Sequence, residues 1–145
     1  MATTTLQHTL TDEAAHKAVA AAVAHARVLG VRVKVAATDS SGLLMAFLRM
    51  PGSFLHSIDI AIDKAYTAAG FGFATECWPA LLESDAALHA AIPQRPRLVV
   101  LGGGVPIYAG PECVGAIGVS GASAEQDAAC ARAGLAATGL SDRPQ

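Results

Sequence analysis

The stretch that decides the fold is Val114-Gly115-Ala116-Ile117-Gly118-Val119-Ser120-Gly121-Ala122-Ser123-Ala124-Glu125-Gln126-Asp127. Its first half is apolar and punctuated by glycine, which predicts a buried strand that leaves through Ser120-Gly121 into a helix. Ser123 and Gln126 have the S-x-x-Q spacing of a capping box, in which the side chains satisfy free backbone N–H groups at a helix start. Glycine lets a ligand approach the backbone closely, so this exit is predicted to form a pocket wall. A tight strand-to-helix connection without a pocket is the equal alternative.

The composition is that of a single folded domain covering residues 1–145. Hydrophobic residues make up 52% of the chain and charged residues 15%, which excludes a disordered protein. This low charge predicts that apolar surface is covered by other copies in a homo-oligomer. The net charge of −2 without a basic run gives no electrostatic footprint for nucleic acid. No apolar run is long enough to span a membrane, so no membrane partner is expected.

Cysteine usage points to a reducing compartment. The three cysteines are Cys77, Cys113 and Cys130, an odd number without C-x-x-C spacing. Such thiols are typical of a cytoplasmic protein rather than of a disulfide framework. The first residues show no charged segment followed by an apolar one, so no secretory signal is predicted. We therefore expect a cytoplasmic location.

Hydrophobic periodicity predicts three long helices. The first follows Thr11 and stops at Gly30, the second begins with Ser57 as its N-cap and runs to Gly70, and the last covers residues 124–138. Trp78, the only tryptophan, is predicted to lie in a loop, as an interface anchor or a pocket lid. Ser84-Asp85 is expected to cap a short helix.

Alternating or continuous apolar runs predict the strands. They are residues 31–38, 43–50, 97–101, 107–109 and 114–120. Short turns join neighbouring strands, which favours antiparallel pairing. The order of elements therefore predicts an α+β fold, with a five-stranded antiparallel sheet and helices packed on it.

Several blocks together resemble a known family. They are Val35-Ala36-Ala37-Thr38-Asp39-Ser40-Ser41-Gly42, Arg49-Met50, Lys64-Ala65-Tyr66-Thr67-Ala68, Gly103-Gly104-Val105-Pro106 and residues 114–127. In this order they resemble the GlcG/HbpS-like family of haem-binding and haem-degrading domains, which includes the C-terminal domain of PduO-type cobalamin adenosyltransferases. The resemblance implies a profilin-like sheet and homo-oligomers from dimers to octamers. Two departures are Pro51-Gly52, where the family usually has Asp-Gly, and Ala122, where it often has glycine.

The ligand that the resemblance favours is haem. A haem site needs an apolar slot and an axial ligand from histidine, cysteine, methionine or tyrosine. The candidate axial ligands are His56, Cys77, Cys113 and Tyr66. Each of them taken alone is more often structural, and His56 leads because it lies at the junction of hairpin and helix. Ser120 and Gly121 complete the predicted cofactor-binding residues; the scattered histidines predict no metal site.

An enzyme is the first alternative. Arg49 at a strand end suits two-point binding of a carboxylate, and the N–H groups around Ser120-Gly121 suit a second anionic oxygen. Lys64 would act as a general base if burial lowers its pKa, and Glu76 and Asp127 are the remaining candidate acids for proton transfer. A surface ion pair and a snorkelling side chain are the structural alternatives for Arg49 and Lys64.

The sequence therefore predicts a small-ligand-binding domain, with haem favoured. The first alternative is a cofactor-free isomerase or lyase that transfers a proton on a small carboxylated or hydroxylated catabolic intermediate. The second is an oligomeric assembly module without a ligand. No Ser-His-Asp order, phosphate loop or dinucleotide fingerprint is present to decide among them.

Overall fold

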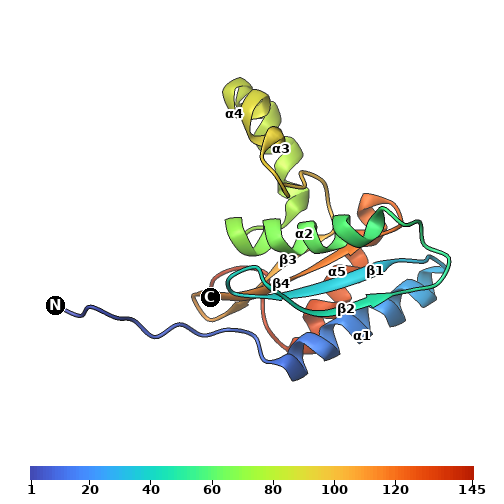
Figure 1. Ribbon diagram of the computed structural model, residues 1–145, viewed down its shortest axis with the longest axis horizontal. Helices are drawn as coiled ribbons and strands as arrows, with labels where there is room; N and C mark the ends of the chain where they lie inside the picture. The colour runs from blue at the N-terminus through green and yellow to red at the C-terminus, as the bar shows by residue number, and fades with distance from the viewer.

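The computed structural model describes residues 1–145 as an α+β fold around one antiparallel sheet (Figure 1). The helices are α1 (Asp12–Leu29), α2 (Ser57–Phe71), α3 (Trp78–Ser84), α4 (Ala86–Ala91) and α5 (Ala124–Thr138). The strands are β1 (Lys34–Asp39), β2 (Leu44–Arg49), β3 (Gly104–Ala109) and β4 (Glu112–Ser120). Two 3₁₀ turns, η1 (Thr75–Cys77) and η2 (Ile92–Gln94), flank the short helices. No helix is both long and apolar enough to cross a lipid bilayer.

The sheet has four strands in the order β2-β1-β4-β3, so the prediction of five strands is wrong. The missing strand is residues 97–101, which run as an irregular segment. Pro96 lacks a backbone donor, and Arg97 adopts a left-handed φ of 64°, which breaks an extended course. The Thr67 side chain of α2 then binds both the Arg97 carbonyl, at 3.1 Å, and the Val99 N–H, at 3.1 Å. Contacts with a helix thus replace the ladder of a strand.

The third strand begins earlier than the sequence predicts. Residues 104–106 belong to β3 and pair with β4, whereas the predicted strand covers only residues 107–109. Proline is tolerated there because β3 is an edge strand, where a missing N–H costs no ladder bond on the open side.

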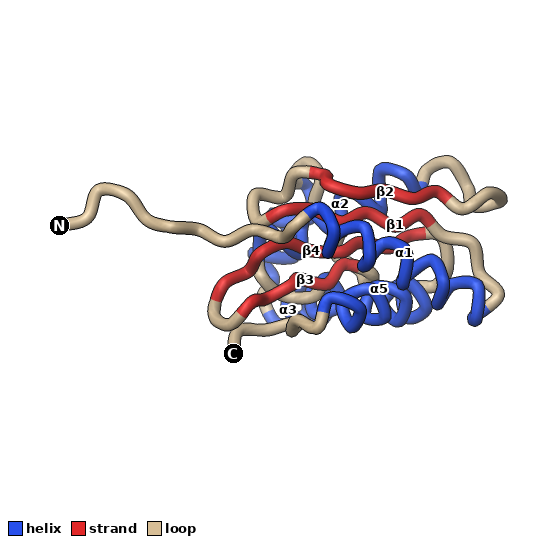
Figure 2. Tube along the Cα trace, turned by 90° about the horizontal axis from the view of Figure 1, so that it is seen from below, coloured by secondary structure: helices blue, strands red, loops and turns tan.

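The helices cover the two faces of the sheet unequally (Figure 2). On one face α1 and α5 pack against each other and enclose the larger apolar core, which includes Val35 and Ile117. On the other face α2 lies alone on a small cluster of alanines. A Cβ atom at Gly118 would collide with the backbone of Ala61 and Ala65 in α2. Gly118, which lies in the stretch 114–127 that decides the fold, therefore allows α2 to pack closely on the sheet.

Most predicted helix ends are confirmed. Thr11 accepts from the Ala14 N–H, Gly30 ends α1 in the left-handed region, and the Ser123–Gln126 capping box is complete. Asp85 caps α4 as predicted. The prediction that Ser57 caps α2 is wrong, because its hydroxyl donates to the Phe54 carbonyl at 2.8 Å and Ser57 is itself the first helical residue.

The helices α3 and α4 form an arm that projects from the sheet (Figure 1). Trp78, the first residue of α3, is only 2% exposed and contacts Phe71 edge to face, with ring centroids 4.8 Å apart. Phe73 lies 5.2 Å from the same indole. Trp78 therefore fastens the arm to the end of α2 within the chain, and its prediction as a loop residue at an interface or over a pocket is wrong.

Candidate functional site

The exit of β4 is filled by the backbone that leads into β1. Gly121 has φ 138°, and a Cβ there would lie 2.5 Å from the Arg32 carbonyl oxygen and 2.9 Å from the Val33 Cα. Ser120, which pairs with Lys34, is only 4% exposed. Packed backbone thus occupies the place where the glycines were expected to line a pocket, and the alternative of a tight connection describes the geometry.

Beside this exit the structure joins two of the predicted catalytic residues. Lys64 Nζ lies 2.9 Å from Asp127 Oδ2, and it also donates to the Val119 carbonyl at 2.9 Å. The other carboxylate oxygen of Asp127 accepts from the Ala122 N–H at 3.0 Å. The side chains of this ion pair are 1% and 3% exposed. The pair links α2, the end of β4 and the first turn of α5.

Burial dominates the electrostatics of this pair. Desolvation lowers the pKa of Lys64, and the Asp127 charge opposes that shift. Desolvation likewise raises the pKa of Asp127 against the effect of the Lys64 charge and of N–H donors from Ala122 and Gly121. A Cβ at Gly103 would lie 2.7 Å from Lys64 Nζ, so backbone closes the remaining side. The pair is therefore a buried ion pair in which burial and mutual attraction oppose each other, and it is enclosed.

The other two predicted catalytic residues lie elsewhere. Arg49 is exposed at the end of β2, opposite Lys34 in the register. Glu76 belongs to η1, and its carboxylate accepts from Arg132 at 2.7 Å. The four predicted catalytic residues thus form one buried pair and two separate surface positions.

The predicted haem residues also separate. His56 is exposed immediately before α2, and Tyr66 lies ten residues further along the same helix. At a rise of 1.5 Å per residue they are about 15 Å apart along the axis, too far to ligate one iron. Ser120 and Gly121 belong to the packed exit of β4. Among these four residues, Tyr66 alone borders a substantial hollow.

That hollow, here named the Tyr66 groove, lies between α2 and the chain returning from the arm. Its volume is about 380 Å³. It is lined by Tyr66, Thr67, Phe71, Ile92, Arg95, Pro96 and Leu98. The guanidinium of Arg97 stacks over the Tyr66 ring at 3.7 Å from the centroid and pairs with Asp63 at 2.9 Å. The groove combines an apolar lining with the Tyr66 phenol and the Arg95 side chain.

The remaining axial candidates are placed less favourably. Cys113 is half-buried on β4, where burial raises the pKa of its thiol and the thiol donates to the Gly115 carbonyl at 3.4 Å. Cys77 borders a hollow of about 500 Å³ with Arg132 and Arg143. Asp142 pairs with both arginines, at 2.7 Å and 2.9 Å, so their charges are already engaged.

One of the scattered histidines also borders a hollow. His16 of α1 lines a space of about 490 Å³ together with Met45 of β2. Histidine and methionine are both haem ligands. Asp12 and Glu13 line the same space, and their charges oppose an anionic ligand.

The Tyr66 groove was only partly predictable. The block Lys64–Ala68 singled out Tyr66, but Ile92, Arg95 and Leu98 come from a segment more than twenty residues away. The alternation of arginine and proline in Arg95-Pro96-Arg97 was the available signal. It indicates an irregular segment that presents cationic side chains rather than a strand.

Comparison with known proteins agrees with this fold. Residues 10–136 match the family described as haem degrading protein HbpS-like. A 15.0 kDa protein encoded in the dhaT-dhaS intergenic region of Citrobacter freundii is 34% identical over 128 residues, which are 88% of this chain and 90% of that protein.

Two crystal structures show the same architecture. The PduOC:heme complex is 29% identical, with a TM-score of 0.86 over 93% of this chain and 99% of the other. A double mutant of Streptomyces reticuli HbpS is 37% identical, with a TM-score of 0.83 over 92% of this chain and 89% of the other.

Proposed function

The chain belongs to the HbpS-like family of haem degrading proteins, and from that premise we propose that it is a haem-binding protein whose site is the Tyr66 groove. A similar structure contains haem, which supports this choice of ligand. One observation carries the choice of site: a single hollow of about 380 Å³ is lined by apolar side chains together with a tyrosine and an arginine.

The residues of the Tyr66 groove fit the chemistry of haem. Phe71, Ile92 and Leu98 offer an apolar lining for the porphyrin, whose burial is favoured by the hydrophobic effect. The Tyr66 phenol is a known type of axial ligand for ferric haem, and Arg95 suits a propionate. Bound haem would supply a redox-active iron; the chain supplies the ligand, the apolar surface and the charge that orients the propionates.

The alternative of a proton-transferring enzyme is less well supported by this geometry. It requires the Lys64–Asp127 pair to meet a substrate, yet both side chains are at most 3% exposed. Arg49, which would hold the substrate carboxylate, is not part of that pair. Haem binding does not require access to the Lys64–Asp127 pair, because neither residue lines the Tyr66 groove.

Titration of the purified protein with haemin tests the proposal. A saturable Soret band is expected at one haem per chain. Tyr66→Phe keeps the ring that packs beside Gly42 and Arg97 but removes the oxygen, so we expect at least about tenfold weaker binding, 1.4 kcal/mol, and an altered visible spectrum of the ferric complex. Tyr108→Phe is the control, because Tyr108 donates to the Gly72 carbonyl away from the groove.

Two results would count against the proposal in different ways. Without a saturable Soret band, haem is not the ligand. With a normal band in Tyr66→Phe and a lost or shifted one in His16→Ala, His56→Ala, Cys77→Ser or Cys113→Ser, haem binds elsewhere and the Tyr66 groove is the wrong site.

We also propose that the protein forms a homo-oligomer in the cytoplasm, within a catabolic setting. The arm supports assembly, since α4 has no buried residue and Leu81 and Phe71 are exposed apolar side chains near it. The exposed thiol of Cys77 suits a reducing compartment. Light scattering coupled to gel filtration tests the assembly: a mass of one chain at micromolar concentration contradicts it.

A further inference from the structure

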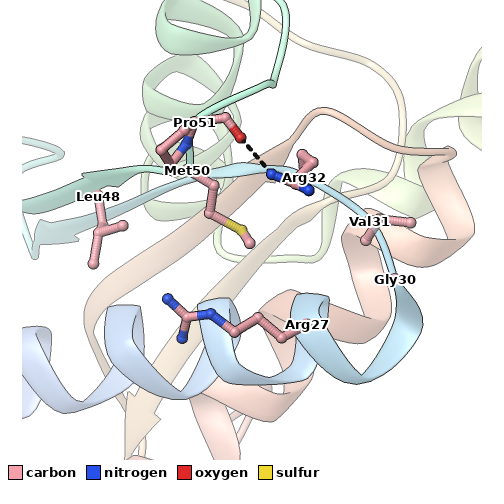
Figure 3. A pocket seen from close by; sticks show the side chains of 7 residues that line it. All are labelled: Arg27, Gly30, Val31, Arg32, Leu48, Met50 and Pro51. Atoms are coloured by element: carbon pink, nitrogen blue, oxygen red, sulfur yellow. Dashed lines mark hydrogen bonds between the residues drawn. The ribbon is translucent and has the colours of Figure 1, made fainter.

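A further hollow lies beside the start of β1 and the end of β2, at the other end of these strands from the turn that joins them. Figure 3 shows the side chains that line it. It has a volume of about 430 Å³ and is here named the arginine hollow. It is lined by Arg27, Gly30, Val31, Arg32, Leu48, Met50 and Pro51. These residues come from the last turn of α1, the turn into β1 and the end of β2. None of them belongs to the Tyr66 groove.

The positive charge of the arginine hollow is not neutralised within the chain. The ion pairs of the protein engage His8, Lys64, Arg97, Arg132 and Arg143, and neither Arg27 nor Arg32. Residues 14–58 contain one acid, Asp39, which lies at the opposite end of β1. Arg32 is held in place by a neutral partner, the Pro51 carbonyl, at 3.1 Å. Two guanidinium groups therefore border one hollow without a carboxylate.

The rest of the arginine hollow is apolar. Met50 is 6% exposed, and its side chain points from the end of β2 toward the guanidinium of Arg27 (Figure 3). Leu48 beside it is 38% exposed, and Val31 is half-buried. A ligand that covered Leu48 and Met50 while meeting the arginines would have to carry one charged end and one apolar end.

The position in the fold opposes a doubly charged anion more strongly than a singly charged one. The arginine hollow lies at the C-terminal end of α1, where carbonyl groups carry partial negative charge and disfavour a dianion such as phosphate. A guanidinium matches a carboxylate through two parallel hydrogen bonds. We propose that the arginine hollow is a binding site for a monocarboxylate with a short hydrocarbon chain, whose head meets Arg27 and Arg32 and whose chain lies on Leu48 and Met50.

Calorimetric titration of the full chain with sodium hexanoate tests the site. One saturable site is expected, with hexanol and inorganic phosphate binding at least about tenfold more weakly, 1.4 kcal/mol each. Arg27→Gln and Arg32→Gln should each weaken hexanoate at least about tenfold. Leu48→Gln should weaken hexanoate while leaving the weaker binding of acetate unchanged. Arg143→Gln is the control, because it removes an exposed arginine that pairs with Asp142, outside both the arginine hollow and the Tyr66 groove.

The variants also define what overturns the proposal. No binding of hexanoate, or equal binding in Arg27→Gln, Arg32→Gln and the unmodified protein, would remove the site. Hexanol binding as tightly as hexanoate would show that the arginines do not select for a charged carboxylate. Phosphate displacing hexanoate at equal concentration would show that Leu48 and Met50 do not contribute to binding. Circular dichroism of each variant confirms that the fold is kept.

Discussion

The buried pair of Lys64 and Asp127 makes a sharp prediction for stability. Asp127→Asn leaves an ammonium group 1% exposed with only the Val119 carbonyl as partner, and Lys64→Met leaves a carboxylate 3% exposed without its counter-ion. Breaking a buried pair by removing one partner costs about 3–5 kcal/mol. For a chain of this size each kcal/mol corresponds to roughly 2–4 °C in Tm, so each variant should melt about 10 °C lower.

The pH dependence distinguishes the two variants by sign. In Asp127→Asn the pKa of Lys64 loses its two raising contributions and falls further below the ordinary value of 10.5. The folded state of this variant then binds fewer protons than its unfolded state. The loss of unfolding free energy relative to the unmodified protein therefore shrinks as the pH rises toward 10.5. In Lys64→Met the pKa of Asp127 rises further above 3.8, so the deficit shrinks as the pH falls toward that value.

The assay is urea unfolding followed by circular dichroism between pH 5 and pH 9. The double variant Lys64→Met with Asp127→Asn keeps an oxygen for the Ala122 N–H and buries no charge. It should therefore lose less stability than the sum of the single losses, by at least about 1 kcal/mol. Additive losses, or deficits that change with pH in the same direction, would refute the inference that two opposed buried charges compensate each other here.

Two further predictions concern the arm and the last helix. Trp78→Ala should lower the free energy of unfolding in urea by about 3–5 kcal/mol, because the indole packs on Phe71 and Phe73 and is 2% exposed. A loss under about 1 kcal/mol would show that Trp78 does not fasten the arm. Ser123→Ala should cost about 1 kcal/mol by removing one half of the capping box. Its control, Ser84→Ala, removes a hydroxyl that only donates to the Leu81 carbonyl, and a control loss as large as that of Ser123→Ala would contradict the capping argument.

The assignment of residues to regular elements followed mainly from local chemistry. The Thr11 and Ser123 caps, the stop at Gly30 and the hairpin around residues 39–42 depend on neighbours a few positions away, and the structure confirms them. The block around Lys64–Ala68 and the stretch 114–127 also identified the family, which the match over residues 10–136 confirms. Two of the wrong predictions were also local: Ser57 bonds backward to Phe54, and Trp78 packs on aromatic side chains a few positions away.

What the sequence determined by itself was the class of the fold, most of its helix ends and the family, because caps, periodicity and turns act over a few residues. The tertiary structure alone decided that residues 97–101 bind Thr67 of α2 instead of forming a fifth strand. It alone brought Lys64 to Asp127 across 63 positions, and it filled the glycine-rich exit of β4 with the backbone that leads into β1. These outcomes depend on which distant segments compete for the same space and the same hydrogen bonds, and no local pattern records that competition.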